Sequence, residues 1–256
     1  MSQPRILIVD DNKMMVKTLQ DILTMKGFQT EIAYSGPEAL QKVEQSTFDC
    51  VLSDIKMPDI DGVQLYRILK TRQPDLPVVL MTAYATDGLV QAGLDEGAVA
   101  VLSKPLNIGL LLKFFAHLSR ERSIIIVDDD PIFCRTLADI LQTQNFAVTQ
   151  VTEADDVQEK LADEGQVVLL DMKLKGSNGL DVLRQIRQQH PYLPVILITG
   201  YPDEVGEAVQ TALKINAYTY FHKPVQIEKL LQTLDEIHHQ ELGRMLGRAV
   251  KKPTPS

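Results

Sequence analysis

Short apolar runs recur along the chain and alternate with longer segments whose apolar residues follow a helical spacing. The runs ILIV, VVLM, IIIV and VILI suit strands that are buried on both faces of a sheet. In one intervening segment Val16, Leu19 and Leu23 recur every three or four positions, as in an amphipathic helix. The pattern predicts strands at residues 6–9, 29–34, 50–53, 78–81, 99–102, 124–127, 147–151, 167–170, 195–198 and 218–221.

The second half of the chain repeats the first. The segment ILIVDD at residue 6 returns as IIIVDD at residue 124, and LPVVLMT at residue 76 returns as LPVILIT at residue 193. We therefore predict two similar α/β domains, each with a mostly parallel sheet that is covered by helices on both faces. The expected bounds are 1–119 for the first domain, 120–123 for a linker, 124–238 for the second domain and 239–256 for a helical extension with a basic tail.

Acidic, hydroxyl and lysine side chains follow the predicted strands at matching places in the two halves. They are Asp10, Asp11, Asp54, Thr82 and Lys104 in the first half, and Asp128, Asp129, Asp171, Thr199 and Lys223 in the second. Because the carboxyl ends of parallel strands meet at one edge of a sheet, we expect each set to lie together. Three carboxylates repel one another unless a cation lies among them, and oxygen ligands suit Mg²⁺. One carboxylate could then act as a nucleophile toward a phosphoryl group, helped by the lysine and the hydroxyl.

Four segments in the same order in each half resemble the receiver domains of two-component response regulators. They are VDD, DIKMPDIDG, LMTAY and LSKPL in the first half, and VDD, DMKLKGSNG, LITGY and FHKPV in the second. The resemblance covers nearly the whole chain. It implies two flavodoxin-like, doubly wound, five-stranded parallel-sheet domains in tandem, working as a phosphorelay protein and not as an enzyme. Such a protein assists its own phosphotransfer and autodephosphorylation.

The resemblance also implies a role for each residue of the two sets. Asp54 and Asp171 would accept the phosphoryl group. The residues that would contact its oxygens are Thr82, Thr199, Lys104 and Lys223. The ligands of Mg²⁺ would be carboxylates and two backbone carbonyls, from Asp10, Asp11, Asp54, Lys56 (backbone), Asp128, Asp129, Asp171 and Lys173 (backbone).

Two departures from the family pattern distinguish the halves. The family usually has an aromatic switch residue three positions before the lysine, and this position holds Tyr220 in the second half but Val101 in the first. A valine cannot swing a polar ring inward, so we expect phosphorylation of the first half to reshape its surface less. In the second half KLKGSNG replaces the Met-Pro turn, and we expect a more flexible loop after Asp171.

Composition narrows the setting in which this chemistry would take place. The chain is 45% hydrophobic and 23% charged, which is ordinary for a globular protein, and its net charge of −8 gives no support to nucleic acid or anionic lipid as a partner. No apolar run approaches the ~18 residues that span a bilayer, and the N-terminus has no secretory pattern. We expect a complete cytoplasmic chain whose two cysteines, Cys50 and Cys134, are reduced core thiols.

The expected partners follow from the resemblance: a sensor histidine kinase or histidine phosphotransfer protein, and a downstream protein target. A homodimer is left open. One alternative makes one receiver a constitutive docking or dimerisation module, and Val101 points to the first half. Another alternative is a phosphatase that forms an aspartyl-phosphate. Such enzymes need a second acid two residues after the nucleophile, where this chain has Lys56 and Lys173.

Two helical segments carry more apolar surface than one sheet requires. In the segment LNIGLLLKFFAHL, Leu110 and Leu112 widen the apolar face of the predicted helix. Two interpretations stay open: the helix is buried deeply in its own domain, or it packs against the second domain or a partner. The last predicted helix continues past residue 238 toward Leu242 and Leu246. That extension is either a dimerising or partner-binding segment or a frayed tail.

Overall fold

The computed structural model describes residues 3–83, 88–118, 122–161, 166–200 and 207–247 of the chain. Residues 120–121 of the expected linker and the tail at 248–256 lie outside the described residues. The described chain divides into two compact units. Unit 1 comprises Met1–Arg120 with His239–Val250, and unit 2 comprises Glu121–His238 with Lys251–Ser256.

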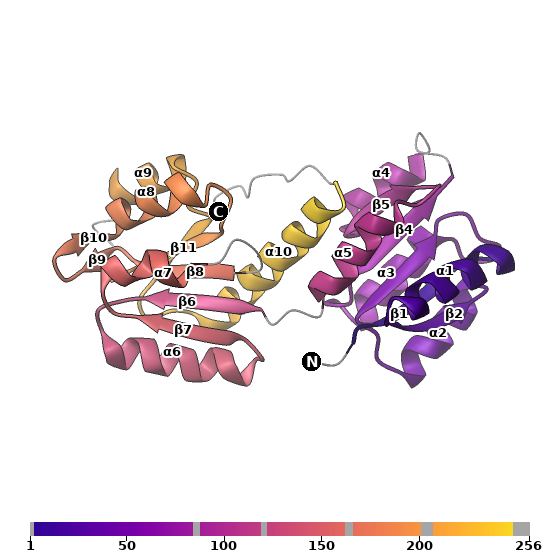
Figure 1. Ribbon diagram of the computed structural model, residues 1–256, viewed down its shortest axis with the longest axis horizontal. Coiled ribbons are helices and arrows are strands. Elements are labelled where there is room, and N and C mark those ends of the chain that lie inside the picture. Colours follow the sequence, from indigo (N-terminus) through magenta and orange to yellow (C-terminus); the bar gives the residue numbers. More distant parts are fainter. Residues whose placement is uncertain (1–2, 84–87, 119–121, 162–165, 201–206, 248–256) are drawn as a thin grey trace. The chain divides into compact units, whose positions relative to one another are not determined.

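Unit 1 is a five-stranded parallel sheet that carries helices on both faces (Figure 1). The strands are β1 (Arg5–Val9), β2 (Gln29–Ala33), β3 (Cys50–Asp54), β4 (Val78–Thr82) and β5 (Ala100–Ser103). Their order in the sheet is β2-β1-β3-β4-β5, with every pairing parallel. The helices are α1 (Lys13–Met25), α2 (Gly36–Gln45), α3 (Gly62–Arg72), α4 (Gly88–Asp95) and α5 (Ile108–Leu118).

Alternate side chains of the strands supply two separate cores, one on each face of the sheet. Leu7 and Val9 of β1 point into a core with residues of α2 and α3, whereas Ile6 and Ile8 point into a core with α1 and α5. Because the central strands β1, β3 and β4 are covered on both sides, their sequences are continuous apolar runs instead of an alternating pattern.

Unit 2 repeats this architecture, and its sheet has the order β7-β6-β8-β11-β12. The strands are β6 (Ser123–Val127), β7 (Ala147–Val151), β8 (Gln166–Asp171), β11 (Val195–Thr199) and β12 (Thr219–His222). The helices are α6 (Pro131–Thr143), α7 (Val157–Lys160), α8 (Gly179–Gln189), α9 (Glu207–Lys214) and α10 (Ile227–Met245). The predicted fold class, two doubly wound five-stranded parallel sheets in tandem, is therefore confirmed.

Unit 2 differs from unit 1 at two places. Its second helix is short, since a 3₁₀ turn (Ala154–Asp156) leads into the four residues of α7. The segment after β8, for which we expected a flexible loop, instead forms an antiparallel hairpin of β9 (Lys173–Leu174) and β10 (Ser177–Asn178). Gly176 lies at its turn with φ of +76°, a left-handed conformation that glycine adopts without a steric penalty.

The end of α10 groups with unit 1. Leu242 is fully buried and Leu246 is 6% exposed, and both belong to the core cluster that contains α1 and α5. The apolar positions Leu110 and Leu112 of α5 are partly buried against the same cluster. The wide apolar face of α5 is therefore packed within unit 1 as the structure divides the chain.

A glycine begins α3 and another begins α8, each next to the carbonyl group of the preceding central strand. A Cβ atom on Gly62 would lie 2.2 Å from the backbone oxygen of Asp54, and one on Gly179 would lie 2.3 Å from that of Asp171. Each glycine also donates a backbone hydrogen bond to the residue after the aspartate, Ile55 or Met172. The close approach fixes the start of the helix against the end of the strand.

We expect Gly62→Ala to lower the free energy of unfolding of unit 1 by about 1–3 kcal/mol, because the new methyl group would displace the backbone at Asp54. Gly109→Ala is the matched control, since its Cβ would lie 3.4 Å from its nearest neighbour, the side chain of Asn107. The control should be neutral or slightly stabilising. Urea unfolding of the full chain, followed by the amide NMR signals of each unit, measures both. Equal stability of the two variants would contradict the close packing.

Candidate functional site

The residues singled out in the sequence meet at the carboxyl edge of each sheet. In unit 1 Asp10 follows β1, Asp54 ends β3, Thr82 ends β4 and Lys104 follows β5. Asp10, Asp54 and Thr82 are almost completely buried, with exposed fractions of 1%, 6% and 2%. Burial of the two carboxylates requires polar partners, and Lys104 supplies one to each of them.

In unit 1 the lysine ammonium lies between two carboxylates. The Nζ atom of Lys104 is 2.7 Å from Oδ2 of Asp10 and 2.5 Å from Oδ1 of Asp54. The backbone amide of Asn12 donates to the other oxygen of Asp10 (2.8 Å), and that of Lys56 donates to the other oxygen of Asp54 (3.1 Å). Both carboxylates therefore have a charged partner and a backbone partner.

Unit 2 repeats this arrangement with one looser contact. Nζ of Lys223 is 2.6 Å from Oδ2 of Asp128 but 3.3 Å from Oδ2 of Asp171. The backbone amide of Asp130 donates to Asp128 at 2.9 Å. The lysine thus lies closer to the acid after the first strand than to the acid at the end of the middle strand.

The lysines are held in place through the ends of neighbouring strands. The backbone amide of Lys104 donates to the carbonyl of Thr82 (2.7 Å), and that of Lys223 donates to the carbonyl of Thr199 (2.8 Å). The peptide bonds that follow the two lysines, to Pro105 and to Pro224, are both cis. The backbone hydrogen bonds place each lysine beside the threonine at the same edge of the sheet.

Burial dominates the electrostatics of the two acceptor carboxylates. It raises the pKa of Asp54 above its ordinary value, and hydrogen bonding to Lys104 opposes the shift without cancelling it. The pKa of Asp171 is also raised, first by burial and then by the charge of Asp128. For Lys104 burial acts to lower the pKa, but hydrogen bonds to Asp10 and Asp54 outweigh it, so the pKa is raised and the lysine keeps its charge.

Each unit brings three carboxylates within reach of a single cation. Oxygen atoms of Asp10, Asp11 and Asp54 lie within 4.8 Å of one another, and so do those of the second set, Asp128, Asp129 and Asp171. Asp11 is exposed and Asp129 half-buried, so the cluster is open to solvent on that side. A donor set made only of oxygens, with a face open to water, fits Mg²⁺, which usually keeps several waters in its coordination shell.

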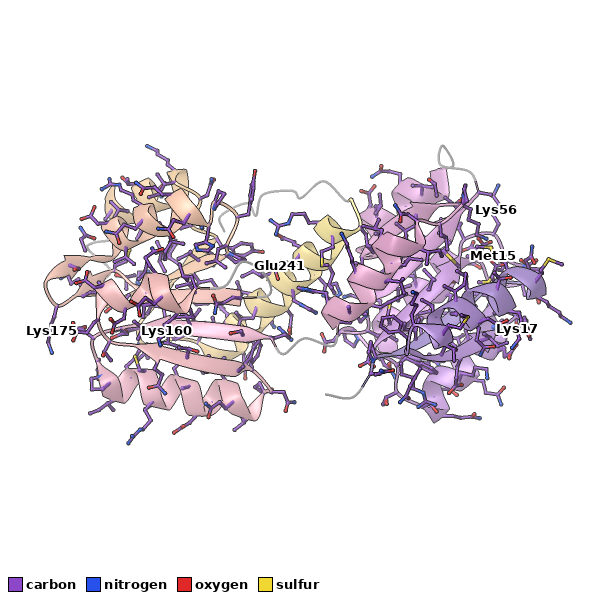
Figure 2. The ribbon with its side chains drawn as sticks, in the orientation of Figure 1. Met15, Lys17, Lys56, Lys160, Lys175 and Glu241 are labelled. Carbon is purple, nitrogen blue, oxygen red and sulfur yellow. The ribbon has the colours of Figure 1, made fainter. Side chains whose placement is uncertain are left out.

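Lys56 and Lys173 stand two positions after the acceptor aspartates. The side chains of Lys56 and Lys173 are exposed, and Figure 2 shows the Lys56 side chain in unit 1. Neither position carries the second acid that a phosphatase forming an aspartyl-phosphate would need. The two expected switch positions also differ in structure. Val101 is a half-buried aliphatic side chain that packs against a core of unit 1, whereas Tyr220 is a half-buried ring that meets His222 edge-on at 5.5 Å.

The family model for the response regulator receiver domain matches the chain twice, at residues 6–116 and 124–235. The chain belongs to the response regulator receiver family. Members of this family are regulatory proteins that interact with kinases or phosphotransfer proteins, and they typically bind Mg²⁺ at an acidic pocket.

Relatives match the chain over one unit or both. A response regulator receiver protein of Anaeromyxobacter sp. (strain Fw109-5) is 30% identical over 236 residues, which cover 92% of this chain and 96% of the relative. The transcriptional regulatory protein ZraR of Klebsiella oxytoca is 38% identical over 109 residues, 43% of this chain and 25% of ZraR. Response regulator MprA of Mycobacterium sp. (strain KMS) is 36% identical over 119 residues, 46% of this chain and 52% of MprA.

Among solved structures, a CheY-like response regulator receiver domain protein of Methanospirillum hungatei JF-1 is 36% identical. The match covers 46% of this chain and 94% of that protein's chain, with a TM-score of 0.43.

Within the described residues, no helix has both the length and the apolar character that crossing a membrane would require. Because two relatives carry names of transcriptional or response regulators with longer chains, the expectation of no nucleic-acid partner stays a prediction.

Some features of the site are not evident from the sequence motifs. Gly62 and Gly179 stand eight residues after the acceptor aspartates, and this equal spacing was the available signal for their role. The ring of Phe133 lies 4.4 Å from Nζ of Lys223, a contact that joins two residues far apart in the sequence. Only the fold brings those two side chains together.

We expect Asp54→Asn to raise the free energy of unfolding of unit 1 at pH 7 in metal-free buffer. The folded state raises the pKa of Asp54, so the stability that this carboxyl contributes is present below its unfolded pKa of about 4 and is lost as the pH rises through its folded pKa. The gain should therefore shrink as the pH falls toward about 4. Urea unfolding in the presence of EDTA, at several pH values, measures it.

The control for this prediction is Asp75→Asn, which removes the same charge from an exposed position. It should leave the pH dependence of unfolding close to that of the wild-type chain. A loss of stability in Asp54→Asn at pH 7 would mean that the pair with Lys104 stabilises the fold by more than burial of the carboxylate costs.

Proposed function

We propose that the protein is a phosphorelay response regulator whose two units each accept a phosphoryl group, on Asp54 in unit 1 and on Asp171 in unit 2. The donor is a phosphohistidine of a sensor histidine kinase or histidine phosphotransfer protein. The observation that carries the proposal is the same in both units: a buried carboxylate ends the middle strand, and a lysine ammonium bridges it to the acid after the first strand.

In the transfer step a carboxylate oxygen of the acceptor attacks the phosphorus atom. An O–P bond forms while the P–N bond to the donor imidazole breaks, and the imidazole leaves with the electron pair and takes up a proton. The charge that develops on the phosphoryl oxygens is stabilised by Lys104 and Thr82 in unit 1 and by Lys223 and Thr199 in unit 2. Little covalent chemistry is required of the protein beyond the nucleophile itself.

Mg²⁺ would be held in unit 1 by the carboxylates of Asp10, Asp11 and Asp54 and by the backbone carbonyl of Lys56. The corresponding ligands in unit 2 are Asp128, Asp129, Asp171 and the carbonyl of Lys173. When bound, the ion neutralises charge on the transferred phosphoryl group. The backbone amides of Asn12 and Asp130 each donate to one oxygen of a buried acid, Asp10 or Asp128. These hydrogen bonds orient the carboxylates so that the other oxygen of each acid lies at the cluster.

The acyl phosphate adds negative charge at the edge of the sheet and biases a two-state surface that a downstream protein reads. Hydrolysis of the acyl phosphate by water returns the carboxylate and inorganic phosphate, which ends the signal. We expect these exchanges to take place in the cytoplasm and without a nucleic-acid partner.

A second candidate function rests on the difference between the two switch positions. Val101 and Tyr220 are both half-buried, but Val101 has no polar group or ring to reposition, whereas Tyr220 carries a phenol ring. In this alternative only unit 2 signals, and unit 1 is a constitutive docking or dimerisation module.

The test is to incubate the full chain with acetyl phosphate and Mg²⁺ and to count phosphoryl groups by intact mass. The variants are Asp54→Ala and Asp171→Ala, with Asp75→Ala as an exposed control. We expect two additions in the wild-type chain and in the control, and one addition in each acceptor variant. Two additions, each lost with its own variant, support the proposed function.

A single addition that disappears only with Asp171→Ala would favour the alternative in which unit 1 is a docking module. No addition from acetyl phosphate, followed by none from a phosphohistidine donor, would contradict the proposed function for both units. Amide NMR spectra of each variant show whether the loss reflects unfolding.

A further inference from the structure

The two acid clusters differ in one contact that the shared motifs do not predict. The lysine of unit 1 lies 2.5 Å from its acceptor aspartate, whereas the lysine of unit 2 lies 3.3 Å from its own. The distances to the other acid, Asp10 or Asp128, are nearly equal at 2.7 and 2.6 Å. The difference is therefore confined to the side of the ammonium that faces the acceptor.

An aromatic ring lies beside the lysine of unit 2. Nζ of Lys223 is 4.4 Å from the centroid of the Phe133 ring, within the ~6 Å over which a cation is attracted to an aromatic face. The position of the ring is fixed, because Phe133 is the third residue of α6 and its amide donates to the N-cap side chain of Asp130 at 3.2 Å. Phe133 is also partly buried against the core cluster of unit 2 to which α6 and α10 contribute.

The equivalent position in unit 1 holds Met15. Both residues stand five positions after the first buried acid and third in their helix, and both are half-buried. Figure 2 labels Met15 at the start of α1. A thioether has no aromatic quadrupole, so it does not attract the ammonium as a phenyl ring does.

We propose that Phe133 is a positioning residue that holds the ammonium of Lys223 over its ring and so away from Asp171. This inference rests on the proposed function of unit 2. The ammonium of Lys223 is then less tightly hydrogen-bonded to the nucleophilic carboxylate of Asp171 than Lys104 is to Asp54. As a consequence, Asp171 accepts a phosphoryl group faster than Asp54 does. Phe133 thus gives the two receivers different phosphorylation rates although their acids, threonines and lysines are the same.

With acetyl phosphate as donor, an oxygen of Asp171 forms the new bond to phosphorus, and the bond from phosphorus to the acetyl oxygen breaks. Acetate leaves with the electron pair, so no oxidant or further reactant is required. An oxygen that is tightly hydrogen-bonded to an ammonium is a weaker nucleophile, because its lone pair and charge are already engaged.

The first measurement is spectroscopic and does not depend on phosphorylation. In the full chain, the ε-methylene protons of Lys223 should be shifted upfield by the Phe133 ring relative to those of Lys104. Phe133→Leu should abolish this shift, and Phe133→Tyr should keep it. Equal shifts for the two lysines in the wild-type chain would overturn the placement of the ammonium.

The second measurement is the rate of mass addition from acetyl phosphate and Mg²⁺ in an Asp54→Ala background, which reports Asp171 alone. We expect Phe133→Leu to slow the addition about two- to fivefold, and Phe133→Tyr to restore it. Replacing Phe133 with phenylalanines that carry one, two or three fluorine atoms should slow it stepwise, because fluorine weakens the attraction with little change in packing. Equal rates across the fluorinated series would overturn the proposal.

The reciprocal variant is Met15→Phe in an Asp171→Ala background, which reports Asp54 alone. It should shift the Lys104 ε-methylene protons upfield and speed the addition at Asp54. An upfield shift of Lys223 without any addition at Asp171, from acetyl phosphate or from a phosphohistidine donor, would contradict the proposed function of unit 2. The same shift would still support the contact of Phe133 with Lys223.

Discussion

The pairing of one lysine with two buried aspartates is the interaction on which each site depends. Three carboxylates converge at the edge of a parallel sheet, and two of them are nearly inaccessible to water. Burial raises the pKa of the acceptor, and the ammonium opposes this shift. Without that charge the pKa of the acceptor would rise further, and the buried carboxylates would repel one another without a compensating cation.

The rest of each unit can be understood as support for that pairing. The apolar strands bury both faces of the sheet and leave their carboxyl ends in register, so residues far apart in sequence end within hydrogen-bonding distance. The glycines that begin α3 and α8 allow the chain to pass directly against the acceptor's carbonyl. Backbone bonds from each lysine to its threonine then fix the last member of the set.

Much of this arrangement could be predicted from the sequence, because buried strands and strand-end residues follow simple patterns. The predicted strands agree with those observed to within about one residue at each end, as for β7 at Ala147–Val151 and β4 at Val78–Thr82. Grouping of the strand-end acids, threonines and lysines followed from the parallel topology. The roles implied for those residues stay predictions.

Other features depend on contacts that no local pattern encodes. The segment KLKGSNG contains glycine and polar residues that suit either a mobile loop or a tight hairpin, and pairing of β9 with β10 decides between them. The contact of Phe133 with Lys223 joins residues that are adjacent only after folding. Likewise, Leu242 and Leu246 are buried in a core cluster to which α5 contributes, and the spacing of apolar residues in α10 does not specify that cluster.

The stoichiometry of Mg²⁺ binding to the full chain, measured by isothermal titration calorimetry, shows whether each unit carries a metal site. The two acid clusters predict two ions per chain, and one ion in Asp10→Asn or in Asp128→Asn, because each variant removes a buried carboxylate from one cluster. Asp75→Asn should still bind two. Binding that is absent from the wild-type chain, or that is unchanged in both cluster variants, would show that these acids do not form two metal sites.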